Sequence, residues 1–275
     1  MPRGITPRQP SRSGRHDKVA AAPLRAKARS PKAAPSSKKA TRPAAPKPAK
    51  KSAGSAPKGY NPVAPARVSE ILQRLDERYP AATCALHHNS AWELLVATIL
   101  SAQCTDVRVN MVTPVIFAKY PTIEAFAALQ PEELEPDIRS TGFFRNKSKS
   151  VVGAARKLLS DFGGQVPRTM DELLQLPGVA RKTANVVLGV SFGKAEGVVV
   201  DTHVFRISRR LELAKGDTAE KVEQELMRVL PQDRWISFSH QIIHHGRKVC
   251  EARKPKCSEC NLETLCRSKD KTWES

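Results

Sequence analysis

The sequence predicts an all-α fold behind a basic N-terminal tail, and three observations support this class. Apolar residues recur at helical spacing from residue 64 onward. Polar residues of the kind that cap helices precede these runs, as Asn89 and Ser90 do for one run and Thr218 does for another. Only Gly197–Val200 reads as extended, and it is too short and too isolated to make a sheet. We therefore expect the body of the chain to be a bundle of helices.

The expected helices follow one another along the body, and each presents an apolar face. The apolar positions of the first three are Val68, Ile71, Leu72 and Leu75, then Leu94, Leu95, Thr98 and Ile99, then Val151, Val152, Ala155, Leu158 and Leu159. The segment after Thr218 is expected to be a surface helix with the stripe Val222, Leu226 and Val229. No apolar run approaches the roughly 20 residues that span a bilayer, and no signal-peptide core follows Met1. We therefore expect a soluble intracellular protein that does not contact membranes.

The positive charge of the chain is concentrated at its N-terminus. The 275 residues carry a formal net charge of +19. Residues 1–60 hold 16 Lys and Arg and a single acid, Asp17, for a net +15, whereas residues 61–275 have a net charge of only +4. Lys, Ala, Pro and Ser dominate this tail, which has too few large apolar residues to offset its ordering entropy. We therefore predict a disordered basic tail over residues 1–62.

Three roles fit the composition of the tail. A block of like charge this long usually serves as an interaction tail, which favours a polycation that holds DNA through its phosphates. The alternatives are a solubilising arm and an organelle transit peptide. Pro2, Pro7 and Pro10 interrupt an amphipathic helix at the extreme N-terminus, so the transit peptide is the least favoured.

A Pro-Gly turn separates two expected helices, and a lysine follows it closely. Gly178, after Pro177, can adopt backbone angles that are closed to other residues. Such a hairpin points backbone N–H groups outward at the positive end of the second helix, which suits a phosphate. Lys182 is expected in the first turn of that helix, partly shielded, where the dipole favours the neutral, nucleophilic amine. Hairpins of this kind also occur between helices with no ligand.

An acidic residue is expected to return to the level of this lysine. The helix from Lys182 to Phe192 rises about 15 Å, and residues 193–201 can reach back by up to about 30 Å. Val198–Val200 would bury the returning segment and hold the Asp201 carboxylate out of water. An amine and a carboxylate at two helix starts would then face one gap. Because Asp201 precedes a helical run, it also fits a plain N-cap.

Four cysteines lie close together near the C-terminus, with the spacing C-x6-C-x2-C-x5-C. They are Cys250, Cys257, Cys260 and Cys266. In a chain without a secretion signal, this density indicates a metal site more than disulfides. The spacing alone does not separate zinc from an iron–sulfur cluster. Cys84 and Cys104 lie in apolar surroundings and are expected to be inert core thiols.

Together these motifs resemble one family. The hairpin Leu176–Ala184, the segment Val200–His203 and the cysteine pattern are similar to those of endonuclease III, a DNA-repair glycosylase with AP-lyase activity. The resemblance extends from about residue 64 to the C-terminus and includes Ile99–Asp106 and Gly142–Ser150. It implies a six-helix barrel domain with a helix-hairpin-helix over residues 84–194. A cluster domain would combine residues 63–83 and 195–275.

The resemblance also implies roles for particular residues. Lys182 would be the Schiff-base lysine and Asp201 the catalytic aspartate. Gln103 would enter the space left by an extruded nucleotide, and Phe143 would be a wedge at a position that is usually aliphatic. The four cysteines would ligate a 4Fe–4S cluster.

The DNA-binding hairpin implied by the resemblance contains Gly178, Ala180 and Arg181. Ala180 stands where the family has a second glycine. Alanine fits if this position starts the helix, whereas a requirement for positive φ there would weaken phosphate binding.

The activity that the resemblance implies is a bifunctional DNA glycosylase and AP lyase of base excision repair. It would excise oxidised pyrimidines through a lysine Schiff base and cleave 3′ of the abasic site by β-elimination. The expected partner is double-stranded DNA with damaged pyrimidines or abasic sites, bound by a monomer. The expected location is the bacterial cytoplasm at the nucleoid, or the nucleus or an organelle in a eukaryote.

Two other functions remain open from the sequence. Adenine-specific mismatch glycosylases share the hairpin, aspartate and cluster, but they lack a lysine at the position of Lys182 and carry a further C-terminal domain. A non-catalytic damage-binding or nucleoid protein would grip DNA with the tail and the hairpin alone. The pairing of Lys182 with Asp201 argues against this second alternative.

Overall fold

The computed structural model describes residues 59–273, and this part of the chain folds into helices without strands. The predicted all-α class is therefore confirmed. All but the last residues of the predicted tail, 1–62, lie outside the described part, so its disorder stays a prediction. The described residues all belong to one compact unit. Among them, no helix is both long enough and apolar enough to cross a bilayer.

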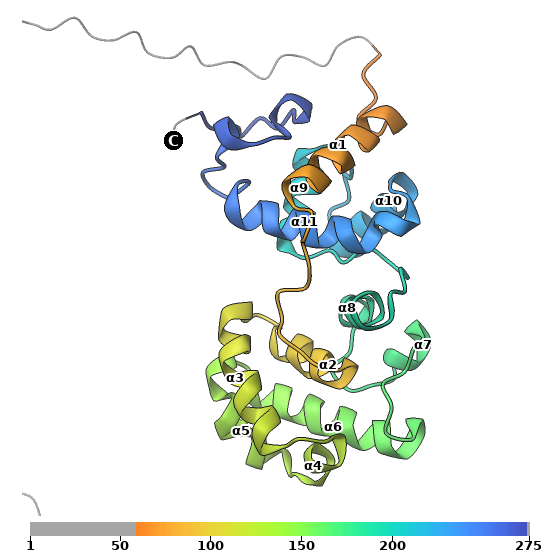
Figure 1. The fold of residues 1–275 in the computed structure, drawn as a ribbon, viewed down its shortest axis with the longest axis vertical. Helices are drawn as coiled ribbons and strands as arrows, with labels where there is room; N and C mark the ends of the chain where they lie inside the picture. Colours follow the sequence, from red (N-terminus) through yellow and green to blue (C-terminus); the bar gives the residue numbers. More distant parts are fainter. Residues whose placement is uncertain (1–58, 274–275) are drawn as a thin grey trace, which may run out of the picture. The chain divides into compact units, whose positions relative to one another are not determined.

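The helices of the described residues follow one another along the chain (Figure 1). The earlier part of the described chain comprises α1 (Pro65–Arg78), α2 (Ala91–Leu100), α3 (Asp106–Lys119), α4 (Ile123–Ala128), α5 (Pro131–Ile138), a 3-10 turn (Arg139–Thr141) and α6 (Phe144–Phe162). The later part comprises α7 (Met170–Leu173), α8 (Arg181–Phe192), α9 (Thr202–Arg210), α10 (Ala219–Val229), a 3-10 turn (Gln232–Arg234), α11 (Trp235–Lys248) and two final 3-10 turns (Cys257–Glu259 and Glu263–Leu265).

Capping residues start the helices at the places where the sequence puts them. The Ser90 hydroxyl accepts a hydrogen bond from the Glu93 N–H, which begins α2. The Thr218 hydroxyl accepts one from the Lys221 N–H, which begins α10. Each bond satisfies one of the N–H groups that a helix leaves without a partner in its first turn. The predicted caps are therefore confirmed.

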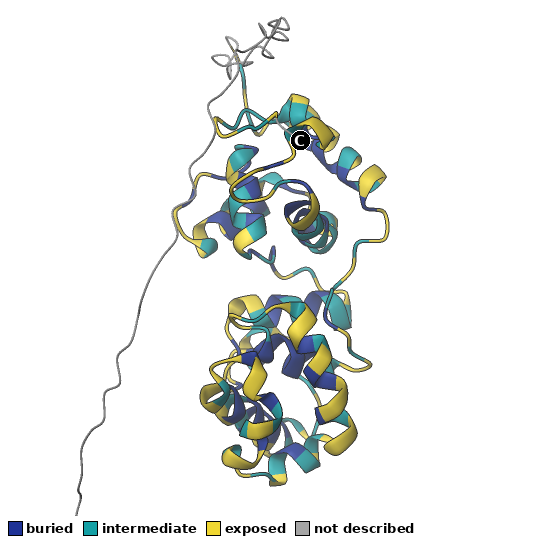
Figure 2. Cartoon of the chain, turned by 90° about the vertical axis from the view of Figure 1, so that its left-hand side faces the viewer, coloured by how far each residue is buried: buried dark blue, intermediate teal, exposed yellow. Residues whose placement is uncertain are grey.

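Two apolar cores hold the described helices together, and buried positions face inward in both (Figure 2). The first core lies among α2 to α8 and includes the fully buried Phe126 and Leu158. The second unites α1 with α9, α10 and α11 and includes the fully buried Ile71 and Phe238. The N-terminal helix α1 packs against α11, although the two are far apart in the sequence. The domain boundaries inferred from the family resemblance stay a prediction.

Candidate active site and cysteine cluster

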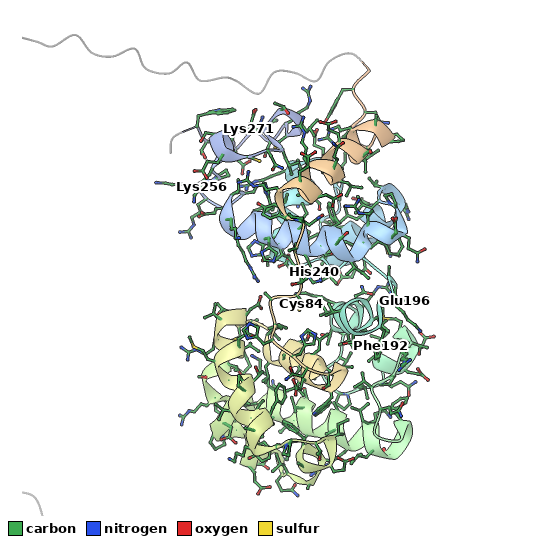
Figure 3. The ribbon with its side chains drawn as sticks, in the orientation of Figure 1. Cys84, Phe192, Glu196, His240, Lys256 and Lys271 are labelled. Carbon is green, nitrogen blue, oxygen red and sulfur yellow. The ribbon has the colours of Figure 1, made fainter. Side chains whose placement is uncertain are left out.

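Residues from five segments line one cavity of about 230 Å³. The catalytic candidates Lys182, from α8, and Asp201, from the start of α9, both line it, and so does Gln103. Cys84 and His240 also line it, and Figure 3 labels both. The structure therefore brings together an amine, a carboxylate and one of the expected DNA-inserting side chains.

The position of Lys182 follows from how α8 begins. Helix α8 starts at Arg181, so Lys182 lies in its first turn, as predicted. The side chain is exposed, so the expected partial shielding was wrong. The reason is the helix face: α8 buries Ala184, Val187 and Leu188 against the first core, and Lys182 lies off that face. The amine is therefore accessible from solvent while it lines the cavity.

The hairpin before α8 has the features of an anion site. Gly178 has φ of +77°, a conformation that favours glycine. Ala180 is the N-cap of α8, has φ of −99° and makes no side-chain capping bond. Alanine therefore fits this position without strain. Because no capping side chain covers the first turn, its N–H groups are left to an external acceptor such as a phosphate.

Gly178 is also fixed by packing against α6, which gives a testable expectation. A Cβ built on Gly178 would lie 2.5 Å from the Cβ of Ser150. We expect Gly178→Ala to lower the free energy of unfolding by at least about 1 kcal/mol, because it adds a clash to the left-handed strain of alanine. It should also weaken duplex binding. Gly163→Ala is the matched control, since Gly163 has φ of +57° with open space around it. Equal effects of the two variants on binding would contradict a special role for the hairpin.

The hydrogen bonds of Arg181 lie within the protein. Its Nε donates to Glu223 of α10 at 3.0 Å. The side-chain amide of Asn185 donates to the same carboxylate at 2.9 Å. The family resemblance places Arg181 in the DNA-binding hairpin, and the structure shows that its guanidinium also links α8 to α10.

Asp201 is both an N-cap and a cavity residue. Its Oδ1 accepts hydrogen bonds from the N–H groups of His203 and Val204, both at 2.8 Å. Among the described residues, no hydrogen bond ends on Oδ2. The preceding Val198 and Val200 are buried, which anchors the returning segment as expected. The capping role therefore occupies one carboxylate oxygen and leaves the other for chemistry in the cavity.

Gln103 and Phe143 share an unusual backbone conformation. Gln103 has φ of 53° and Phe143 has φ of 48°, and they are two of three non-glycine residues with positive φ in the described chain. Both side chains are exposed, Phe143 by 61%. Backbone strain of this kind gathers at functional sites, where the surrounding structure holds it in place. Phe143 is the N-cap of α6, and it does not line the cavity.

Sequence reasoning missed the wall of the cavity that α11 supplies. His240, Ile243, His244 and Arg247 line the cavity from one helix face. Their i, i+3, i+4, i+7 spacing is the signal that identifies this face in the sequence. Arg247 pairs with Asp106, at the start of α3, over 2.5 Å. Burial lowers the pKa of His240, so its imidazole is biased toward the neutral form.

The two remaining cysteines were expected to be inert core thiols. Cys84 and Cys104 are partly buried and pack against the first core. Cys84 also lines the cavity, which the sequence did not reveal. Burial raises the pKa of the Cys84 thiol and so disfavours the reactive thiolate, in agreement with an inert role.

The four C-terminal cysteines line a second cavity together. All four are partly buried free thiols, so the structure contains no disulfide among them. Among the described residues, no three His, Cys, Asp or Glu side chains form a group suited to a single metal ion. Four thiols around one cavity nevertheless match the donor set of an iron–sulfur site held by four thiolates. The Arg210 guanidinium donates a hydrogen bond to the Cys250 sulfur at 3.2 Å.

Arginines of α1 fasten the cysteine segment to the second core. Each donates a hydrogen bond to a backbone carbonyl of this segment. The pairs are Arg67 to Leu265, Arg74 to Asn261 and Arg78 to Glu259, at 2.7, 2.8 and 3.0 Å. The segment has little regular structure of its own, so these bonds supply order that its short 3-10 turns do not.

Comparisons with known proteins agree with this fold and site. The family model described as HhH-GPD superfamily base excision DNA repair protein matches residues 96–232. Endonuclease III of Synechocystis sp. is 56% identical over 202 residues, which cover 74% of this chain and 92% of that protein. Endonuclease III of Escherichia coli K12 is 42% identical over 202 residues, which cover 74% of this chain and 95% of that protein.

Solved structures give the same result. A trapped covalent endonuclease III–DNA intermediate, the estranged-adenine complex, aligns with a TM-score of 0.70 and 43% identity, over 74% of this chain and 96% of that chain. A thermostable thymine-DNA glycosylase aligns with a TM-score of 0.65 at 23% identity, which supports the fold alone. The chain is thus a base excision DNA repair protein of the HhH-GPD superfamily. Within that superfamily it belongs to the endonuclease III family.

Proposed function

We propose that this protein is a bifunctional DNA glycosylase and AP lyase that excises oxidised pyrimidines. The observation that carries the proposal is that Lys182 and Asp201 line one cavity beside a hairpin suited to a phosphate. Solved complexes of endonuclease III with DNA support DNA as the partner. The proposed partner is a duplex with a damaged pyrimidine or an abasic site, bound by a monomer.

Extrusion of the damaged nucleotide comes first in the proposed reaction. A base inside the stack cannot be reached, so the nucleotide leaves the helix and enters the cavity. Gln103 fills the space that it leaves, and Phe143, as an aromatic wedge, stacks on the neighbouring bases. The hairpin around Gly178 holds a backbone phosphate, which fixes the sugar within reach of Lys182.

Lys182 then acts as the nucleophile. Its neutral Nζ attacks the sugar C1′, the bond to the base breaks, and the base leaves with a proton. Asp201 assists the proton transfers through its free carboxylate oxygen and stabilises the positive charge that develops on the sugar. The ring opens to an imine between Nζ and C1′. The imine acidifies C2′, and loss of a C2′ proton expels the 3′ phosphate by β-elimination.

The two alternative functions differ from this proposal at Lys182. An adenine-specific mismatch glycosylase would release a base without a covalent imine. A damage-binding or nucleoid protein would bind the duplex and release nothing. The exposed amine in the cavity is the feature that favours the lyase over both.

The proposal is tested with two duplexes, one with an oxidised pyrimidine and one with an abasic site. We expect release of the base from the first and strand cleavage of both. Borohydride should convert part of each reaction into a covalent protein–DNA adduct. Base release without cleavage or adduct would support a monofunctional glycosylase instead, and binding without base release would support the non-catalytic alternative.

We further propose that the four C-terminal cysteines hold a 4Fe–4S cluster. The donor set, the shared cavity and the family support this assignment. The cluster would supply structural order, by folding a short basic loop, Glu251–Lys256, against the DNA backbone. Purified protein is expected to be yellow-brown with about four irons per chain. Colourless protein with one zinc would contradict the 4Fe–4S cluster, and only the assignment of the four cysteines as metal ligands would remain.

The tail is proposed to contribute binding and not chemistry. Residues 1–58 hold all 16 of the tail's cations, whereas the Tyr60 hydroxyl donates a hydrogen bond to Glu212 of the body. Deleting residues 1–58 therefore removes the charge and keeps this contact. Each phosphate contact contributes about 0.9 to the slope of log affinity against log salt, so we expect the slope to fall by several units.

Two measurements check this division of roles. Duplex affinity at several salt concentrations gives the slope, and single-turnover cleavage at saturating protein gives the chemical rate. An unaltered slope would make the tail a bystander. A collapse of the saturated rate in a folded deletion variant would show that the tail takes part in the active complex.

A further inference from the structure

Lys147 is a buried lysine that none of the proposed steps uses. It lies in the first turn of α6 and is 5% exposed. Its Nζ donates a hydrogen bond to the carbonyl of Leu100 and another to the carbonyl of Thr141, both at 2.8 Å. Leu100 ends α2, and Thr141 ends the 3-10 turn before α6. One amine thus joins the ends of two separate elements.

The two carbonyls lie just before the loops that carry the DNA-inserting candidates, Gln103 and Phe143. Gln103 follows Leu100 by three residues, and Phe143 follows Thr141 by two. Both candidates have a positive φ and an exposed side chain, so neither is held by packing of its own. The Lys147 amine is a common anchor point for the two loops.

The burial of the Lys147 amine and of the two carbonyls favours a single, fixed arrangement of these three groups. Backbone carbonyls and an amine that are buried without partners cost free energy, so the three groups stabilise one another only when all are in place. Burial lowers the pKa of Lys147. Two N–H donors are enough for the two carbonyls, so the network does not depend on a net charge. At the end of α2, the amine also satisfies a carbonyl that the helix leaves unpaired.

We propose that Lys147 is a positioning residue that holds Gln103 and Phe143 at a fixed separation, so that they enter the duplex as a pair. This inference rests on the proposed function and goes beyond it, because it names the group that sets nucleotide extrusion. Lys147 touches neither the sugar nor the base. It acts through the two loops.

The test compares two single-turnover rates in the Lys147→Met variant, whose side chain has similar length but no donors. One rate is excision of an oxidised pyrimidine from an intact duplex, and the other is cleavage of a preformed abasic duplex. A small misplacement of positioning groups costs up to about 100-fold, so we expect excision to fall by about 10- to 100-fold. Abasic cleavage should fall much less, because no base has to be unstacked.

A combined variant tests whether Lys147 acts through the two loops. In a Gln103→Ala and Phe143→Ala background, Lys147→Met should cause little further loss of excision, because the residues it positions are already gone. A full multiplicative loss in that background would overturn the proposal. The matched control is Lys194→Met, which removes a bond from an exposed lysine to the carbonyl of Arg168 and should leave the ratio of the two rates unchanged.

A purely structural role of Lys147 gives a different result. Loss of folded protein would lower both rates by the same factor, and this equal loss would overturn the proposal. If Lys147→Met does not fold, Lys147→Gln retains an amide donor and is judged by the same ratio. Wild-type protein is measured alongside: if it performs neither reaction, the proposed function fails. If it performs both and the variant's ratio is unchanged, only this inference fails.

Discussion

Lys182→Gln is expected to abolish the borohydride-trapped adduct and to lower strand cleavage at an abasic site by more than about 10³-fold. Glutamine has nearly the same length as lysine, but its amide nitrogen cannot form an imine. The side chain is exposed and lies off the buried face of α8, so the fold and duplex binding should be retained. Trapping and cleavage are measured by gel after reaction with the abasic duplex. Full trapping by the variant would remove the Schiff-base role from Lys182.

Lys221→Gln is the matched control for this variant. Lys221 also lies in the first turn of a helix, α10, and is exposed, but it does not line the cavity. Its Nζ pairs with Asp217 at 2.8 Å on the surface, where solvent screens the contact and leaves it little effect on stability. Trapping and cleavage should therefore match wild type. A comparable loss in both variants would indicate a general effect of removing a helix-start cation.

Asp201→Asn is expected to lower turnover by about 10²- to 10⁴-fold while leaving duplex binding intact. The structure makes this substitution informative, because asparagine caps a helix about as well as aspartate does. Its side-chain oxygen can still accept from the N–H groups of His203 and Val204. The variant thus removes the charge in the cavity and keeps the cap. Unchanged turnover would reduce Asp201 to a capping residue.

Asp201→Ala is a second variant that separates the capping role of Asp201 from its catalytic role. It removes both the charge and the cap, so it should also lower the free energy of unfolding by about 1 kcal/mol. Asp201→Asn should show the catalytic loss without this destabilisation. Thermal unfolding of both variants, measured beside their single-turnover rates, checks the assignment. If only the destabilised variant lost catalytic rate, the carboxylate would have no chemical role separate from the cap.

The helices and their starts could be predicted because they depend on local chemistry. Periodic apolar residues such as Ile71 and Leu72 define a face whatever packs on it, and both are buried in α1. Ser90 caps α2 through neighbouring N–H groups only. The packing of α1 against α11 could not be predicted in this way, because it joins segments far apart in the sequence.

The candidate site was predictable only in part. Lys182 and Asp201 sit at helix starts whose spacing along the chain constrains their positions, and both line the cavity. The exposure of Lys182 was misjudged because the orientation of α8 depends on its packing partners. The α11 wall was missed because it belongs to a helix packed in the second core. Lys147 was missed because a buried lysine interrupts the apolar pattern of α6 in the same way as an exposed one.

The central claim is that Lys182 attacks the sugar, and mapping of the trapped adduct tests it most directly. Wild-type protein is reduced with borohydride on an abasic duplex, digested with protease and nuclease, and analysed by mass spectrometry for the modified residue. The account predicts a single site, a reduced sugar remnant on Nζ of Lys182. A remnant on another lysine or on an N-terminal amine, with Lys182 unmodified, would contradict it.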